Sequence, residues 1–251
     1  CYLRVDDTGT TTARVRGFET MSDVSTGSGP FPSAAQFAGG LWWSKSNAAS
    51  SAAVAWRIYA DDRGIYFFVK NLGEGGEYQG NYFGDILSLK SGDPYACVLR
   101  GNAADKSVTA GGTFGDDLIY ADGSQTFDGL YAARAANTLG GAIKVHSAPV
   151  LATGMAATHV TGSVGFTYPL PVDNGLMLTP VLLHNAQGPR GYLPGLRYSP
   201  QIVSGSFSTG DVVAGSGDMA GKKVQAVRLG ALITTPAQCG CVFVDHTSDW
   251  R

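Results

Sequence analysis

Residues 54–69 read VAWRIYADDRGIYFFV. On both sides of the central DDRG the side chains follow a period of two, the spacing of a β-strand whose successive residues point to opposite faces. This period places Trp56 and Ile58 on one face and Arg57 and Tyr59 on the other. A short connection that ends in glycine suits the turn between antiparallel strands. The stretch therefore predicts a β-hairpin.

Short segments of the same kind recur along the chain. Clusters such as SGDP at 91–94 and DNG at 173–175 are turn signals that separate them. Many short strands with turns between them predict an all-β protein, an antiparallel sandwich or barrel-like fold with glycine-rich long loops and little helix. Short helices are candidates only at 131–139 and, more weakly, at 44–53, where serine and asparagine compete for backbone hydrogen bonds. Further strands are expected at 13–18, 85–90, 95–100, 143–146, 177–183, 223–229 and 241–245.

Composition supports a chain built from strands and turns. Glycine accounts for 35 of the 251 residues, roughly twice its average usage. Of the 20 acidic residues 17 are aspartate, which favours turns, and three are glutamate, which suits helix interiors. We expect one β-rich unit over residues 1–251, with any boundary between sub-sheets falling within 101–141. Because the chain opens on Cys1 and 2–5 already have a strand pattern, we also expect a preceding segment.

Charge and motifs argue against several classes of function. A net charge of −2 and a pI near 6.1 are not typical of nucleic-acid binding, and no apolar run is long enough to span a membrane as a helix. The sequence contains neither Gly-x-Ser-x-Gly nor His-Glu-x-x-His. GSGDMA at 215–220 fits a loose dinucleotide pattern, but a strand is predicted after it where a helix is required. We expect no enzymatic activity and no cofactor.

Metal binding is also not predicted. The Cys239-Gly-Cys241 pair has only Asp245 and His246 nearby, and zinc sites usually need a second pair of ligands. Reduced, buried thiols on a final strand are the simpler interpretation. The paired aspartates at 61–62 and 116–117 lie in predicted turns and are interpreted as turn residues.

Aromatic segments are the candidates for contacts with other molecules. Trp42-Trp43 follows two glycines, and Tyr78, Tyr82 and Phe83 lie in a glycine-rich stretch that is expected to be an exposed loop. Such rings serve as platforms for sugars or as anchors in protein interfaces. The preferred interpretation is that one tryptophan of the pair points into the core and the other contacts a neighbouring subunit or loop. The candidate interface residues are Trp42, Trp43, Tyr192, Leu193 and Pro194.

An ordered series of motifs runs along the chain. The motifs are YLRVDDTG at 2–9, RGFETMSDV at 16–24, GLWWSKS at 40–46, FGDI at 83–86, GDPYAC at 92–97, PVDNGL at 171–176, RGYLPG at 190–195 and the terminal WR. The series resembles a poorly characterised family of virion structural proteins from tailed bacteriophages. The resemblance implies a structural, tail-associated component of the virion that contacts other virion proteins and copies of itself. It implies no catalytic or binding residue, and relatives carry an additional N-terminal segment.

Three roles therefore remain open. A structural part of the tail or baseplate is the first expectation. A capsid decoration protein and a tail module that binds a carbohydrate of the host surface are the alternatives. The virion layer, copy number and symmetry are not predicted.

Overall fold

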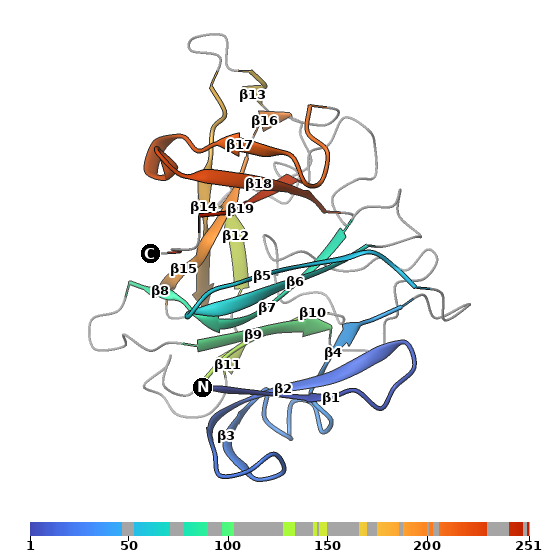
Figure 1. Ribbon diagram of the computed structural model, residues 1–251. Helices are drawn as coiled ribbons and strands as arrows, with labels where there is room; N and C mark the ends of the chain where they lie inside the picture. The colour runs from blue at the N-terminus through green and yellow to red at the C-terminus, as the bar shows by residue number, and fades with distance from the viewer. Residues whose placement is uncertain are drawn as a thin grey trace.

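A computed structural model shows a protein made almost entirely of antiparallel β-strands (Figure 1). Among the residues it describes, the only helical element is a 3-10 turn, η4 (Gly217–Met219). None of the described helical segments is long and apolar enough to cross a membrane. The all-β expectation is confirmed. The described residues are 1–46, 53–70, 78–89, 97–102, 128–133, 143–144, 146–149, 166–169, 175–185, 188–199, 201–202, 206–229, 241–247 and 250.

The first sheet has ten strands, with the central order β1-β2-β4-β9-β7-β6-β5. β3 pairs with β2, and β10 joins β9 to β11. Its strands are β1 (Tyr2–Asp6), β2 (Thr12–Met21), β3 (Gly27–Phe31), β4 (Leu41–Ser44), β5 (Trp56–Ala60), β6 (Gly64–Lys70), β7 (Tyr78–Asp85), β9 (Cys97–Asn102), β10 (Asp128–Ala132) and β11 (Ile143–Lys144).

The second sheet has seven strands in the order β12-β14-β15-β19-β18-β17, with β8 paired to β15. A small parallel pair, β13 (Phe166–Thr167) and β16 (Gln201–Ile202), stands apart. The seven strands are β8 (Leu87–Ser88), β12 (His146–Pro149), β14 (Thr179–Asn185), β15 (Gly188–Tyr198), β17 (Val212–Ala214), β18 (Lys223–Arg228) and β19 (Cys241–Asp245).

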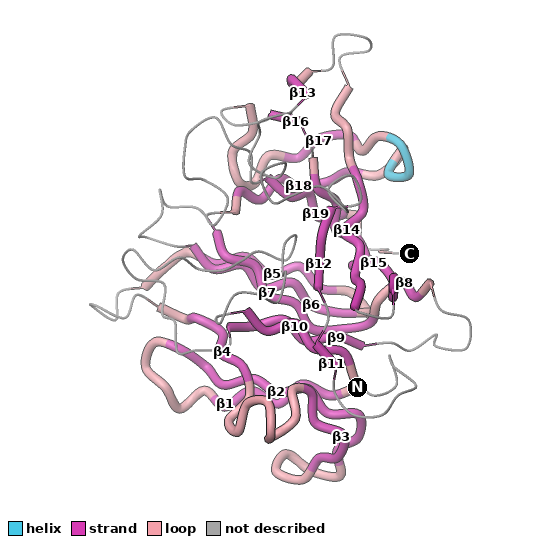
Figure 2. Tube along the Cα trace, turned by 180° about the vertical axis from the view of Figure 1, so that it is seen from behind, coloured by secondary structure: helices cyan, strands magenta, loops and turns pink. Residues whose placement is uncertain are grey.

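The largest apolar core lies between the two sheets. From the first sheet Tyr66, Phe68 and Tyr82 enter it, and from the second Leu193 and Val242, all fully buried. Alternate residues of each strand face this core, as the period of two requires. Figures 1 and 2 show the long strands β14 and β15 running across the direction of β5, β6 and β7. The molecule is therefore a sandwich of two crossed sheets.

Two smaller cores cover the other faces of the sheets. Because the first sheet curls, Val15, Phe31 and Leu41 of β2, β3 and β4 pack near Phe67 and Phe83 of β6 and β7. On the outer face of the second sheet, Phe243 packs with residues of neighbouring loops, including Phe207 and Met219. Strands such as β19 are consequently buried on both faces.

The predicted hairpin at 54–69 is confirmed, with β5 and β6 as its two strands. β5 and β6 pair antiparallel, with Trp56 opposite Val69 and Ala60 opposite Ile65. Asp61 stabilises the turn, because its carboxylate accepts hydrogen bonds from the amides of Arg63 (2.7 Å) and Gly64 (3.1 Å).

Other strand predictions are confirmed with shifted bounds, and one helix prediction is wrong. The segments at 13–18, 223–229 and 241–245 correspond to β2, β18 and β19. The candidate helix at 131–139 begins inside β10, where Tyr131 pairs with both Leu99 and Lys144. Sheet pairing on both sides outweighs the helix preference of the local sequence there. Residues 134–139, and 47–52 of the second helix candidate, lie outside the described part.

We expect Cys97 to resist alkylation while the protein is folded. Burial, helped by the nearby Asp85 carboxylate, raises the pKa of its thiol to about 12, and the thiolate is the nucleophile. At pH 8, iodoacetamide should label Cys97 slower than the exposed Cys1 by on the order of 1,000-fold or more. Peptide mass mapping with and without denaturant measures this difference. Equal labelling of both thiols in the native protein would contradict the buried position of β9.

Candidate functional site

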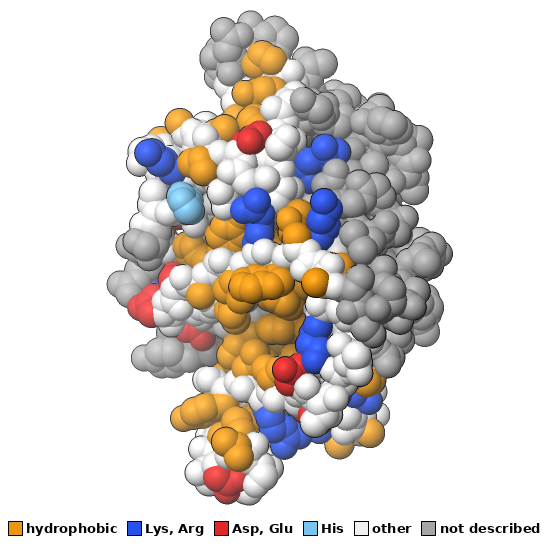
Figure 3. Space-filling view, turned by 45° about the vertical axis from the view of Figure 1, so that its right-hand side comes forward, with side chains coloured by type: hydrophobic (Ala, Val, Ile, Leu, Met, Phe, Trp, Pro, Cys, Tyr) orange, Lys and Arg blue, Asp and Glu red, His pale blue; other side chains and the backbone are white. Residues whose placement is uncertain are grey.

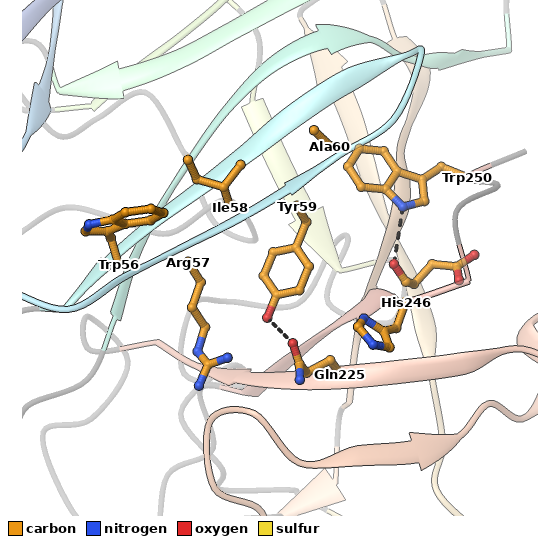
Figure 4. A pocket seen from close by; sticks show the side chains of 9 residues that line it. Trp56, Arg57, Ile58, Tyr59, Ala60, Gln225, His246 and Trp250 are labelled. Carbon is orange, nitrogen blue, oxygen red and sulfur yellow. Dashed lines mark hydrogen bonds between the residues drawn. The ribbon is translucent and has the colours of Figure 1, made fainter.

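A groove opens where the edge of the first sheet meets the second sheet. It has a volume of about 470 Å³. β5 forms one wall, and β18, β19 and the C-terminal Trp250 form the other (Figure 4). The lining residues are Trp56, Arg57, Ile58, Tyr59, Ala60, Gln225, Asp245, His246 and Trp250.

The strand β5 divides its side chains between the groove and the outer surface. Tyr59 and Arg57 point toward the second sheet, where the Tyr59 hydroxyl donates to Gln225 Oε1 (2.6 Å) and Arg57 Nη2 donates to the Thr209 carbonyl (3.3 Å). Trp56 and Ile58 lie on the opposite side of the strand (Figure 4). They remain 60% and 48% exposed. The lip of the groove is thus an exposed apolar strand face.

The opposite wall is held by Trp250. Its indole N–H donates to the Asp245 carbonyl (3.3 Å), and the centroid of its ring lies 5.0 Å from the ring centroid of Tyr66. Its backbone N–H donates to Asp61 Oδ2 (3.4 Å), in the β5–β6 turn. Trp250 therefore links the hairpin of the first sheet to the last strand of the second.

Several polar groups of the groove have hydrogen-bond partners within the protein. Both carboxylate oxygens of the buried Asp245 are used, Oδ2 by Lys222 Nζ (2.8 Å) and Oδ1 by the Thr247 amide (2.8 Å). Burial raises the pKa of Tyr59, so this hydroxyl stays protonated and acts as a hydrogen-bond donor near neutral pH. The lining contains neither serine nor cysteine.

Three of the five predicted interface residues belong to the protein's own core. Trp43 is 7% exposed and its indole N–H donates to the Arg100 carbonyl (2.8 Å). Leu193 and Pro194 are buried in β15, where the Pro194 carbonyl accepts a hydrogen bond from Tyr66. The expectation that Leu193 and Pro194 are exposed is wrong, because β15 is buried on both faces from Leu193 onward. Trp43 is the tryptophan of its pair that points into the core. Trp42 and Tyr192 are half-buried and remain able to contact another chain.

The aromatic residues expected in an exposed loop are instead strand residues. Tyr78, Tyr82 and Phe83 belong to β7, and Tyr82 is fully buried against Tyr66 at 4.5 Å between ring centroids. They form no platform for a sugar. The exposed aromatic residue at the groove is Trp56. Its strand was predicted, but local alternation does not say which face of a strand the second sheet will cover.

Among the described residues, the candidate metal ligands do not gather into a site. Within the described residues no three His, Cys, Asp or Glu side chains lie close enough to hold a metal ion. Cys241 is buried and reduced, whereas Cys239 and the pair at 116–117 lie outside the described part. Asp61 acts in the hairpin turn, as predicted.

We expect Gly195→Ala to destabilise the protein more than Gly217→Ala. Both glycines adopt left-handed backbone, with φ of +63° and +60°, so both substitutions add strain of about 1–2 kcal/mol. A Cβ on Gly195 would lie 2.5 Å from the Trp250 ring, whereas a Cβ on Gly217 meets nothing within 4 Å. In Gly195→Ala, but not in Gly217→Ala, overpacking should lower the free energy of unfolding by about a further 1–3 kcal/mol. Urea denaturation measures both variants. Equal losses would show that Trp250 does not seal this end of the groove.

No known family model matches this chain, and a search of curated proteins finds no relative.

Proposed function

We propose that this protein is a non-enzymatic structural subunit of a tailed-phage particle, located in the tail or baseplate, and that it packs against other subunits through β5. The motif series from YLRVDDTG to RGYLPG supports the particle assignment. The all-β sandwich and the engaged polar groups of the groove support a role in contact rather than catalysis. The partners are other virion proteins or further copies of this chain.

The exposed outer face of β5 is the observation that carries the proposal. β5 is the terminal strand of its sheet, and β6 is its one strand neighbour among the described residues. Terminal strands present unpaired backbone groups, and proteins usually protect them with charges, proline or a covering segment. Here the face carries Trp56 and Ile58 instead. Figure 3 shows hydrophobic side chains gathered over the middle of the molecule, at the level of this hairpin.

Burial of this face would contribute to the free energy of assembly. Burying a large apolar side chain contributes about 1.5–3 kcal/mol, and interface hot spots are enriched in tryptophan. Trp56 and Ile58 lie beside a groove that can accept part of a partner. A second subunit would bury both side chains without disturbing the fold.

We expect the double substitution Trp56→Ser with Ile58→Ser to reduce incorporation into particles at least about tenfold. Folding should be preserved, since both side chains are largely exposed. Val212→Ser is the matched control, because Val212 is 45% exposed on β17 of the other sheet. The measurements are the amount of protein in purified particles and far-ultraviolet circular dichroism. Normal incorporation of the folded double variant would refute the role of β5.

Immunogold labelling tests the location within the particle. Tail labelling is expected. Labelling confined to the capsid faces would replace the tail proposal by a capsid decoration role, and absence from purified particles would overturn the structural proposal altogether.

A tail module for host carbohydrate is the second candidate, and Trp56 is the observation that favours it. An exposed indole at the lip of a groove that is also lined by Arg57 and Gln225 resembles the aromatic platforms that hold sugars near polar groups. Arg57 Nε is buried without a hydrogen-bond partner among the described residues, and a sugar hydroxyl would satisfy it. A glycan array discriminates the two candidates. Specific binding that Trp56→Ser abolishes would establish this role.

A further inference from the structure

A second cleft, of about 350 Å³, lies on the first sheet where β1 pairs with β2. In the register of this pair Arg4 is directly opposite Arg16, and Asp6 is opposite Arg14. All four side chains therefore belong to one face of the sheet. Like charges directly opposite each other destabilise a strand pair. A compensating anion would turn this repulsion into attraction.

Neutral groups hold the guanidinium groups of Arg4 and Arg14 in place. Arg14 lies 3.6 Å from the centroid of the Trp42 ring and donates to the Gly40 carbonyl (2.8 Å). Arg4 lies 4.9 Å from the centroid of the Phe18 ring and donates weakly to the Ser25 carbonyl (3.3 Å). These rings and carbonyls orient the guanidinium groups without neutralising their charge.

Arg16 is buried and incompletely satisfied. It is 8% exposed and donates through Nη2 to the Phe37 carbonyl. Its Nε–H is buried and has no hydrogen-bond partner within the described part of the chain. Burial is the main cause that lowers the pKa of Arg16, and the positive charges of Arg4 and Arg14 lower it further. A buried donor beside two further cations is what an oxyanion site requires.

The acids near the cleft offset only part of its positive charge. Asp6 accepts a hydrogen bond from the Thr8 amide (3.1 Å), and its carboxylate also interacts electrostatically with Arg4 and Arg14. Asp23 accepts from Ser25 Oγ (2.6 Å) and from the Ser25 and Thr26 amides, and these bonds lower its pKa to about 2. No ion pair within 4 Å joins any of the three arginines to a described acid. Three arginines and one carboxylate line the cleft, which therefore keeps a net positive charge.

We propose that this cleft binds the carboxylate of an acidic segment of a partner protein. Arginine recognises carboxylates through paired N–H donors. The lining also contains the loop residue Val24, which is 87% exposed. A protein segment that carries an acid beside an apolar residue would cover both the charge and this valine, whereas a free anion would leave the valine in water. The site is separate from β5 and does not depend on the particle assignment.

The probe is the peptide acetyl-Val-Asp-Asp-Val-amide, with acetyl-Val-Asn-Asn-Val-amide as its neutral counterpart. Binding is followed by NMR of the arginine Nε–H resonances. We expect the aspartate peptide to shift the Arg16 resonance saturably at concentrations up to about 10 mM, with weaker binding at higher salt. The asparagine peptide should leave the resonance unchanged.

Substitutions locate the effect. Arg4→Gln should weaken binding roughly tenfold, because it removes one charge while Arg16 stays in place. Lys223→Gln removes the same charge from an exposed position on β18 and should not change the affinity. Inorganic phosphate is the third arm of the experiment. A shift with phosphate but not with the peptide would assign the cleft to a free oxyanion and overturn the protein-segment proposal. No shift with either, or equal binding by Arg4→Gln, would overturn the site itself.

Discussion

The structure depends on the apolar contact between the two sheets. Tyr66, Phe68 and Tyr82 meet Leu193 and Val242 with no exposed surface. The Tyr66 hydroxyl donates to the Pro194 carbonyl (2.7 Å) and so has a partner from the opposite sheet. A buried hydroxyl without a partner would be costly, and this bond allows aromatic volume to fill the space without that cost.

Crossing of the sheets explains where the surface features lie. Because the second sheet runs across the first, it covers only the inward side chains of β5, and the outer face of the strand is left exposed. Trp250 fills the corner between the sheets, and the groove opens beside it. The exposed lip at Trp56 is therefore a consequence of how the sandwich is assembled.

The opposite end of the first sheet carries charged side chains instead of an apolar face. There β1 and β2 form the edge, and the register of their pairing brings Arg4, Arg14 and Arg16 onto one face. Loops from 22–26 and 33–40 supply carbonyls to these arginines. One end of the sheet is thus apolar and the other cationic, which makes two chemically distinct contact surfaces on one chain.

Local sequence determined the elements of this protein, and tertiary structure determined their environment. The hairpin at 54–69, the strand at 241–245 and the all-β class follow from a period of two and from turn residues, which are local properties. Burial is not local. Trp43 and Leu193 enter the core, whereas Trp56 stays exposed, because the covering strands come from distant parts of the chain. The arginine cluster likewise arises from strand register, which pairs Arg4 with Arg16 across a turn. Alternation defines two faces of a strand, and only the packing of sheets decides which face meets water.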